Sequence, residues 1–221
     1  MGFRRWPVVG PVVAVAASVA TLTSGPAPTA GAGGCPDVEL VFARGTAEPP
    51  GLGAVGGALF AALQPALGSR SVEAYAVNYP ASYNFLTTAD GAKDARDHIA
   101  SMADRCPATR LVLGGFSQGA AAVSMLAGVP PLGDRIGNFG SAPPLDPGLA
   151  GKVAAVAVFG SPGNRFGTPL SSTGLFAGRA IDLCSPGDPV CTVGGRDRDA
   201  HSDYESPPYP GQAAGFVAGL V

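Results

Sequence analysis

Ser117 stands between two glycines in the segment 110–120, which reads RLVLGGFSQGA. An apolar run precedes this serine and a row of alanines follows it, so the pattern predicts a buried strand, a tight turn and a helix. A serine nucleophile needs a turn so sharp that its hydroxyl projects clear of the backbone, and Gly115 and Gly119 remove the Cβ atoms that would collide there. The alternative is an ordinary serine in a glycine-rich turn. We interpret Ser117 as a nucleophile because both flanks have the required pattern.

A serine hydroxyl is a weak nucleophile until a neighbouring base accepts its proton. Where Gly-x-Ser-x-Gly carries the nucleophile, the residues follow in the order serine, acid and histidine along the chain. His201 is the only histidine after Ser117, because the other histidine, His98, precedes the serine in a charged helical segment. His201 is therefore the expected base, and His98 is expected to be a helix residue outside the site.

The acid that would orient this histidine has several candidates. Asp188 follows an apolar run and lies between Cys184 and Cys191, so a disulfide there would hold its carboxylate still. The alternative for Asp188 is a turn residue, because Pro-Gly-Asp-Pro favours a turn by itself. We favour Asp188, and the remaining candidates are Asp134, Asp146, Asp182, Asp197, Asp199, Asp203 and Glu205.

Acyl transfer also needs two N–H donors at the point where negative charge develops on the carbonyl oxygen. The backbone N–H of Gln118, directly after Ser117, is one expected donor. The second donor is expected from the loop after an early strand, and FARGTAEPPG over 42–51 is that loop. Thr46 is the best candidate there, through its N–H and also its hydroxyl. From the loop alone, an ordinary threonine would be the simpler interpretation.

The chain has four cysteines, which allow three disulfide connectivities. Cys184 and Cys191 are close enough in sequence for a local bridge, and this leaves Cys35 to pair with Cys106. The alternatives are free thiols and metal ligands. With two histidines and no close cysteine pair of zinc-finger spacing, no metal is expected.

The first 32 residues differ from the rest of the chain. Two arginines precede an apolar stretch over 8–22, and small residues at 30–32 provide a cleavage site, which is the layout of a secretory signal. A membrane anchor is the alternative, and the shortness and prolines of the stretch argue against it. We expect residues 1–32 to be a signal peptide, 33–221 to be one domain, and the protein to be extracellular or loosely associated with the cell wall.

The remaining chain alternates strand-like and helix-like segments. Continuous apolar runs are typical of strands covered on both faces, and their alternation with helices predicts a doubly wound α/β fold with a parallel sheet. The glycine-rich stretch 160–178 is predicted as a surface loop that could face a substrate. The expected strands are 38–42, 72–77, 111–114, 153–159 and 180–183, and the expected helices are 53–67, 89–104, 117–126 and 211–220.

Charge excludes one class of function. The formal net charge is −2 and the lysines and arginines do not cluster in the sequence, so nothing in the charge pattern indicates nucleic-acid binding. Gly and Pro are abundant, at 33 and 22 residues, yet 46% of residues are hydrophobic and gather in strand-like runs. A loop-rich globular enzyme fits this composition better than a low-complexity chain.

The chain resembles the cutinase family, in particular the small secreted cutinase-like esterases of mycobacteria and related actinobacteria. The segments that carry the resemblance are CPDVELVFARGTAEPPGLG (35–53), YAVNYPAS (75–82), CPATRLVLGGFSQGA (106–120) and CSPGDPVC (184–191), together with His201. The resemblance implies an α/β-hydrolase fold with a central parallel five-stranded sheet, helices on both faces and no lid domain. The site residues that it implies are nucleophile Ser117, acid Asp188, base His201, oxyanion-hole residues Thr46 and Gln118, and disulfides Cys35–Cys106 and Cys184–Cys191.

Three positions depart from the family pattern. Fungal cutinases carry serine where this chain has Thr46 and often tyrosine where it has Phe116, and many relatives have an acidic residue where it has Ser161. The first two changes keep the hydroxyl and the ring, so they bear on substrate range more than on chemistry.

The resemblance implies a secreted, monomeric serine esterase that needs no cofactor and has no stable membrane anchor. Its expected substrates are short- to medium-chain fatty acyl esters and cutin-type polyesters, cleaved through an acyl-enzyme on Ser117. The alternatives are a phospholipase, an acetylxylan esterase or a thioesterase, and a non-catalytic cell-wall binding protein. Apolar loop residues that could line an acyl groove are Phe85, Leu86, Leu175, Phe176 and Val190, although such residues are more often core or loop anchors.

Overall fold

The computed structural model describes residues 1–2, 34–133 and 139–221. It divides the chain into two units, Met1–Gly34 and Cys35–Val221. The predicted signal peptide falls almost wholly outside the described residues. None of the described helices is long and apolar enough to cross a membrane.

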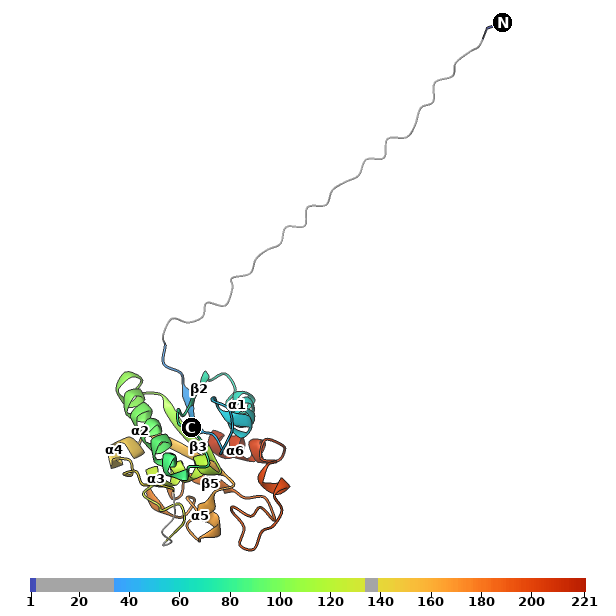
Figure 1. The fold of residues 1–221 in the computed structure, drawn as a ribbon. Helices are drawn as coiled ribbons and strands as arrows, with labels where there is room; N and C mark the ends of the chain where they lie inside the picture. Colours follow the sequence, from blue (N-terminus) through green and yellow to red (C-terminus); the bar gives the residue numbers. More distant parts are fainter. Residues whose placement is uncertain (3–33, 134–138) are drawn as a thin grey trace. The chain divides into compact units, whose positions relative to one another are not determined.

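The unit Cys35–Val221 is built on a sheet of five strands in the order β2-β1-β3-β4-β5 (Figure 1). Every neighbouring pair is parallel, which confirms the predicted sheet. The strands are β1 (Val38–Ala43), β2 (Val72–Ala76), β3 (Arg110–Phe116), β4 (Val153–Phe159) and β5 (Ala180–Leu183).

Helices cover both faces of this sheet, as expected. In Figure 1, α2 (Thr88–Arg105) and α3 (Gln118–Leu126) lie on one side and α1 (Gly53–Ala66) and α6 (Tyr209–Ala218) lie on the other. Each face encloses its own core: Ile99 and Met102 of α2 belong to the first, and Leu59 of α1 belongs to the second. The α/β-hydrolase architecture is thus a three-layer sandwich.

Successive side chains of β1 point to opposite faces of the sheet, and both faces are buried. This explains why the apolar runs show no alternation of hydrophobic and polar residues. Leu40 and Phe42 belong to the core beneath α1 and α6, while Val41 and Ala43 belong to the core beneath α2 and α3. Because both faces are covered, every second residue is buried on one side and its neighbours are buried on the other. The strand therefore reads as continuously hydrophobic.

The stretch 160–178 is not the plain surface loop that its composition predicts. It contains a short helix, α5 (Pro162–Arg165), and a 3₁₀ turn, η2 (Gly174–Phe176). Leu170 and Phe176 are both fully buried in the core beneath α2 and α3. The turn-forming residues dominate the composition, but two apolar side chains anchor the stretch to the core.

Several element boundaries also differ from those expected. Helix α6 begins at Tyr209, two residues early, because Pro210 fits the first turn of a helix. Strand β3 continues to Phe116, directly before Ser117. The short elements that the sequence pattern did not predict are α4 (Pro147–Ala150), η1 (Phe85–Thr87) and η3 (Asp199–His201).

Two disulfides join the chain, and they pair as the sequence favoured. Cys35–Cys106 ties the segment before β1 to the segment before β3 across 71 residues. Cys184–Cys191 closes a short loop directly after β5. Among the described residues no cysteine is free.

The order of the strands determines where the loops that follow β1 and β3 meet. The chain runs from β1 outward to β2, then returns to β3 and continues to β4 and β5 on the other side. The carboxyl ends of β1 and β3 therefore flank the point where the winding direction changes. In open parallel sheets, this crevice is where ligands bind.

Candidate active site

Ser117 occupies a strained turn between β3 and α3. Its backbone angles are φ 53° and ψ −111°, a region that residues with a side chain rarely adopt. Its N–H donates to the carbonyl oxygen of Phe159 on β4 at 2.9 Å, which holds the turn against the sheet. Strain of this kind persists where surrounding structure enforces it, and it commonly marks a functional position.

The flanking glycines are required by close packing at this turn. A Cβ on Gly119 would collide with the carbonyl oxygen of Ala43 at the end of β1, and a Cβ on Gly115 would lie 2.5 Å from the carbonyl carbon of Gly119. These contacts confirm the reason given for the glycines. The turn can be this tight only if α3 approaches β1 without intervening side chains.

Three polar side chains form a continuous hydrogen-bonded chain at this turn. Nε2 of His201 lies 2.9 Å from Oγ of Ser117, and Nδ1 of His201 lies 2.8 Å from Oδ2 of Asp188. The serine and the histidine are 84 residues apart in sequence. The structure therefore brings together the three residues that the sequence selected, in the order nucleophile, base, acid that general-base activation of a serine requires.

Asp188 is fully buried, yet its carboxylate is well supplied with donors. Oδ1 accepts the N–H of Val190 at 2.7 Å, and Oδ2 accepts a bond from Tyr204 in addition to that from His201. Burial works to raise the pKa of Asp188, but the bonds from His201, Tyr204 and Val190 together hold the pKa below its usual value. The carboxylate is consequently ionised and able to orient the imidazole.

Tyr204 is a partner of the acid that sequence inspection did not identify. It is fully buried, and its hydroxyl donates to Oδ2 of Asp188 at 2.5 Å while accepting the N–H of Ser185 at 2.8 Å. Burial and the bond to Asp188 raise the pKa of Tyr204, so the hydroxyl keeps its proton and remains a donor. A tyrosine three residues after the histidine was the only hint in the sequence.

None of the other described acid candidates hydrogen-bonds His201, although Glu205 lies in the same cleft wall as that histidine. Asp182 accepts the N–H groups of Leu170 and Ser171, so it anchors the stretch 160–178 to β5. Asp197 accepts the N–H groups of Asp199 and Ala200 at the start of η3. Asp134 is outside the described residues, and among those described Asp188 is the acid that hydrogen-bonds His201.

Thr46 and Gln118 meet across the crevice between β1 and β3. The Thr46 hydroxyl donates to Oε1 of Gln118 at 3.0 Å, and Nε2 of Gln118 donates to the hydroxyl of Thr88 at 3.0 Å. The Gln118 side chain is buried at 1% exposure. The hydroxyl of Thr46, one of the two donors expected from this residue, therefore already has an acceptor in Gln118. The expectation that both the N–H and the hydroxyl of Thr46 could serve as oxyanion donors is therefore reduced to the N–H.

These residues open on a cleft of about 460 Å³. Ser117 and His201 lie in its wall, and two carboxylates, those of Glu48 and Glu205, line it as well. Among the residues that the structure describes, no lysine or arginine lines this cleft. The rest of the lining consists of Thr46, Ala54, Val55, Tyr83, Phe116 and Ser202.

The apolar residues expected to line an acyl groove divide into two groups. Phe176 is fully buried and is therefore a core anchor, and Phe85 stacks on Phe139 with ring centroids 5.1 Å apart. Leu86 is 58% exposed and Tyr83, which the sequence did not suggest, is 78% exposed and lines the cleft. These two exposed side chains therefore lie in and directly before η1, and of the two only Tyr83 lines the cleft.

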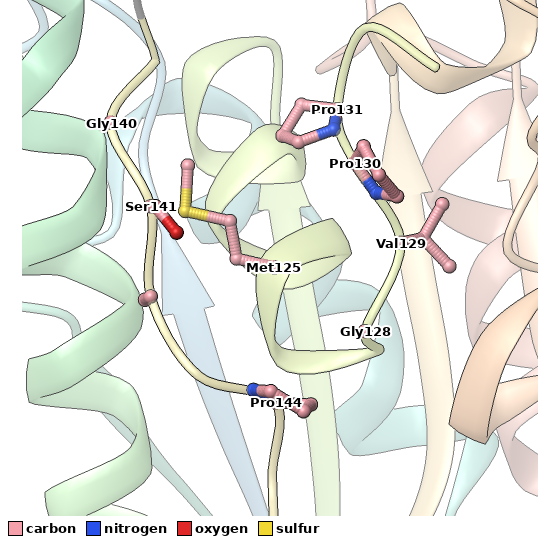
Figure 2. Close-up of a pocket in the computed structure, with 9 residues that line it drawn as sticks. Met125, Gly128, Val129, Pro130, Pro131, Gly140, Ser141 and Pro144 are labelled. Atoms are coloured by element: carbon pink, nitrogen blue, oxygen red, sulfur yellow. The ribbon is translucent and has the colours of Figure 1, made fainter. Parts of the chain in front are cut away.

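A second hollow of about 300 Å³ lies beyond the end of α3. Figure 2 shows Met125 facing it from α3, with two backbone segments, one through Val129 and one through Ser141, on its sides. Among the described residues that line it, none has an ionisable side chain, and the hydroxyl of Ser141 is the one polar side-chain group. The described part of this lining therefore contains no acid, base or activated nucleophile. In the described part of the chain, no three His, Cys, Asp or Glu side chains gather as a metal centre would require.

Comparison with known proteins identifies the family. Residues 34–221 match the family model described as Cutinase. The chain belongs to the cutinase family. Cutinase relatives from Mycobacterium tuberculosis match over most of their length: "Probable carboxylesterase Culp3" is 51% identical over 86% of this chain and 71% of the relative. "Phospholipase Culp4" is 48% identical over 94% of this chain and 88% of the relative.

Solved structures of the cutinase family share the fold. Trichoderma reesei cutinase in complex with a C11Y4 phosphonate inhibitor has a TM-score of 0.67 and 34% identity, over 84% of this chain and 77% of that one. The catalytic core domain of acetyl xylan esterase from Trichoderma reesei has a TM-score of 0.72 and 26% identity, over 85% and 100%. This member of the cutinase family is accordingly a serine carboxylic ester hydrolase with the α/β-hydrolase fold.

Proposed function

We propose that this cutinase hydrolyses esters through an acyl-enzyme on Ser117, with His201 as base and Asp188 as the residue that orients it. The observation that carries the proposal is the unbroken chain of hydrogen bonds from Ser117 through His201 to a buried, ionised Asp188. We further propose that the N–H groups of Thr46 and Gln118 hold the developing oxyanion.

In the first half-reaction, Nε2 of His201 takes the proton of the Ser117 hydroxyl as Oγ attacks the ester carbonyl carbon. The carbonyl oxygen becomes negative and is held by the two N–H donors. Collapse of this intermediate breaks the bond to the alcohol, which leaves with the proton that His201 carries. Asp188 keeps its negative charge and stabilises the imidazolium.

In the second half-reaction, water replaces the alcohol. His201 takes a proton from water as its oxygen attacks the acyl carbon bound to Ser117, and the same donors hold the oxyanion. The acid product leaves and Oγ recovers its proton. The cycle uses only side chains and backbone groups of this chain, so the proposal requires no cofactor.

We propose short- to medium-chain fatty acyl esters, cutin-type polyesters among them, as substrates. The cleft wall combines the apolar side chains of Val55, Tyr83 and Phe116 with the carboxylates of Glu48 and Glu205. This lining favours uncharged esters, because an anionic group beside Ser117 would be placed near two carboxylates without a cation to receive it.

A phospholipid is the second candidate substrate, favoured by one observation. The relative named "Phospholipase Culp4" is 48% identical over 94% of this chain. Within this cleft, a phospholipid would have to keep its phosphate directed toward solvent, away from Glu48 and Glu205. A zwitterionic phospholipid would then be cleaved more slowly than a neutral ester of the same acyl length.

We also propose that the protein is secreted and acts as a monomer without a stable membrane anchor. The two disulfides support secretion, because such bonds persist in oxidising compartments outside the cytosol. The leader-like sequence over 1–32 supports it independently.

The test is hydrolysis of p-nitrophenyl esters from butyrate to octanoate by the purified protein, with phosphatidylcholine assayed in parallel. Ser117→Ala is expected to abolish turnover, while Ser141→Ala, in the hollow of Figure 2, serves as the matched control. A phosphonate label should add its mass to the peptide that contains Ser117. A wild-type protein that neither turns over esters nor takes the label would overturn the proposal.

A further inference from the structure

The loop between β1 and α1 carries Thr46, and a buried arginine fixes its beginning. Arg44 is 4% exposed, and its guanidinium donates from Nη2 to the carbonyl oxygen of Tyr79 at 2.7 Å and from Nε to that of Glu48 at 2.9 Å. The hydroxyl of Tyr79 donates back to the carbonyl oxygen of Arg44 at 2.6 Å. These bonds hold the backbone on either side of Thr46. Two backbone bonds add to them, since the N–H of Ala47 donates to the carbonyl oxygen of Ala81 at 2.6 Å and the N–H of Glu48 donates to that of Gly45 at 3.3 Å.

The carboxylate of Glu48 ties this loop to the start of helix α1. Oε2 accepts the N–H of Gly45 at 2.5 Å, and Oε1 accepts the N–H of Ala54 at 2.8 Å. One anion therefore joins the residue directly before Thr46 to the first turn of α1. Hydrogen bonds to an ionised acceptor are about twice as strong as those between neutral groups.

Helix α1 lacks a capping side chain of its own, and Glu48 fills this role from outside the helix. Leu52 occupies the N-cap position and makes no side-chain cap. Gly53 has φ +69°, and a Cβ at that position would lie 2.6 Å from Cδ of Glu48. The glycine thus leaves the space in which the carboxylate reaches the helix terminus, where a negative charge is favoured.

We propose that Glu48 is a positioning residue for the oxyanion hole. This inference rests on the proposed function, in which the N–H of Thr46 holds the oxyanion. Gly45 lies between two peptide groups: its own N–H is fixed by Glu48, and its carbonyl belongs to the peptide that presents the Thr46 N–H. Fixing Gly45 against α1 therefore sets the direction of the Thr46 N–H before substrate arrives. Donors held in place in advance stabilise the developing charge without reorganisation.

The competing explanation is that Glu48 acts only as a negative charge in the cleft wall. Glu205 provides the matched control, because it lines the same cleft and carries the same charge. Its side chain is exposed, and among the described residues it makes no hydrogen bond to a backbone N–H of the Thr46 loop. Glu205→Gln consequently measures the loss of a cleft charge, whereas Glu48→Gln also places an amide NH₂ against a backbone donor.

The experiment compares Glu48→Gln, Glu48→Asp and Glu205→Gln in the full chain with p-nitrophenyl butyrate. Misplacement of one oxyanion donor should lower kcat of Glu48→Gln by about 10- to 100-fold while KM changes by less than about threefold. The inhibition constant of a trifluoromethyl ketone, which forms an oxyanion adduct on the serine, should rise by the same factor as kcat falls. Glu48→Asp keeps the charge but is too short to join both N–H groups, so it should also lose kcat and affinity for the ketone.

Equal effects of Glu48→Gln and Glu205→Gln, or a wild-type kcat in Glu48→Asp, would overturn the inference. Active-site titration with a phosphonate counts the folded, labelled enzyme, so kcat is expressed per competent site even where a variant folds in low yield. Failure of the proposed function looks different. In that case the wild type would lack turnover or Ser117→Ala would retain it, whatever the Glu48 variants do.

Discussion

The molecule contains two histidine–carboxylate pairs of nearly identical geometry. In one, Nδ1 of His201 lies 2.8 Å from Asp188; in the other, Nε2 of His98 lies 2.9 Å from Glu39. The exposed fractions are also close, at 20% for the His201 side chain and 13% for the His98 side chain. Hydrogen-bond length and burial therefore do not distinguish a site for chemistry from a structural contact.

The difference lies in where each pair is attached and what it faces. His98 projects from the middle of α2 and Glu39 from within β1, and the ring of Tyr75 stacks on His98 at 3.5 Å between centroids. His201 belongs to the short η3 turn beyond the sheet, where its second nitrogen meets Ser117. A pair becomes chemically useful when it is carried by loops at the carboxyl edge and ends on a strained nucleophile. The following substitutions test this contrast, beginning with the largest expected effect.

Replacement of the two histidines should give the largest difference in activity. His201→Ala is expected to lower kcat by about 10⁴-fold or more, because the general base is lost. His98→Ala should leave kcat within about twofold but lower the free energy of unfolding by about 3 kcal/mol, since a buried carboxylate loses its partner. Ester hydrolysis and urea unfolding of both variants measure the difference. A large fall in kcat for folded His98→Ala would contradict the contrast.

The two carboxylates should repeat the pattern on a smaller scale. Asp188→Asn keeps the size of the side chain but favours the wrong tautomer of His201, so kcat should fall by about 10⁴-fold or less. Glu39→Gln should leave kcat within about twofold and alter stability by about 1–3 kcal/mol. For each variant, kcat for ester hydrolysis and the midpoint of denaturant unfolding are measured and compared. If both variants lost activity in proportion to stability, the two pairs would be equivalent.

A tyrosine accompanies each pair, and the partner of Asp188 should matter more. Tyr204→Phe removes a donor from the buried carboxylate, and a bond to a charged group is worth about 1.5 kcal/mol, so kcat should fall about tenfold. The change also removes one of the bonds that hold the pKa of Asp188 below its usual value, so this pKa rises. A carboxyl group whose pKa is lower in the folded than in the unfolded state stabilises the fold at pH values above its unfolded pKa of about 3.9. This stabilisation is lost as the pH falls through the pKa of the folded state. Acid unfolding of Tyr204→Phe should therefore begin at higher pH, and an unchanged acid transition would contradict this.

Tyr75 is the counterpart of Tyr204 in the other pair, and its replacement should have the smallest effect on stability and activity. Its hydroxyl donates to Asp94 at 3.0 Å, and burial together with this bond raises the pKa of Tyr75 to about 12. Tyr75→Phe keeps the ring on His98 and loses only the hydrogen bond, so stability should fall by about 1 kcal/mol with kcat unchanged. Thermal unfolding and ester hydrolysis of the two tyrosine variants, measured side by side, sharpen the comparison.

Much of the fold and site could be predicted because strong local signals carried them. Continuous apolar runs indicated the parallel sheet, and the glycines around Ser117 indicated the tight turn. Chain order left His201 as the base candidate, and the local cysteine pair singled out Asp188. Each of these inferences depended on residues that are adjacent in sequence or restricted in number.

The missed features depend on packing between distant segments. Tyr204 bonds to Asp188 across a separation of 16 residues, and its burial cannot be inferred from the polar residues beside it in the sequence. Glu48 gave a weak signal: it precedes a helix whose N-cap position is occupied by Leu52. Leu170 and Phe176 are two apolar residues in a stretch of turn formers, and only the tertiary structure shows that they anchor it.

The distance along the chain between the site's components has a consequence for biogenesis. Thr46 follows the first strand, Ser117 the third, and Asp188 the fifth, while His201 comes 13 residues after the acid. No partly folded intermediate that lacks the last of these segments can hold the complete site. Ester turnover therefore serves as a direct count of molecules that have completed folding, and burst labelling during refolding would time the docking of the final segment on the sheet.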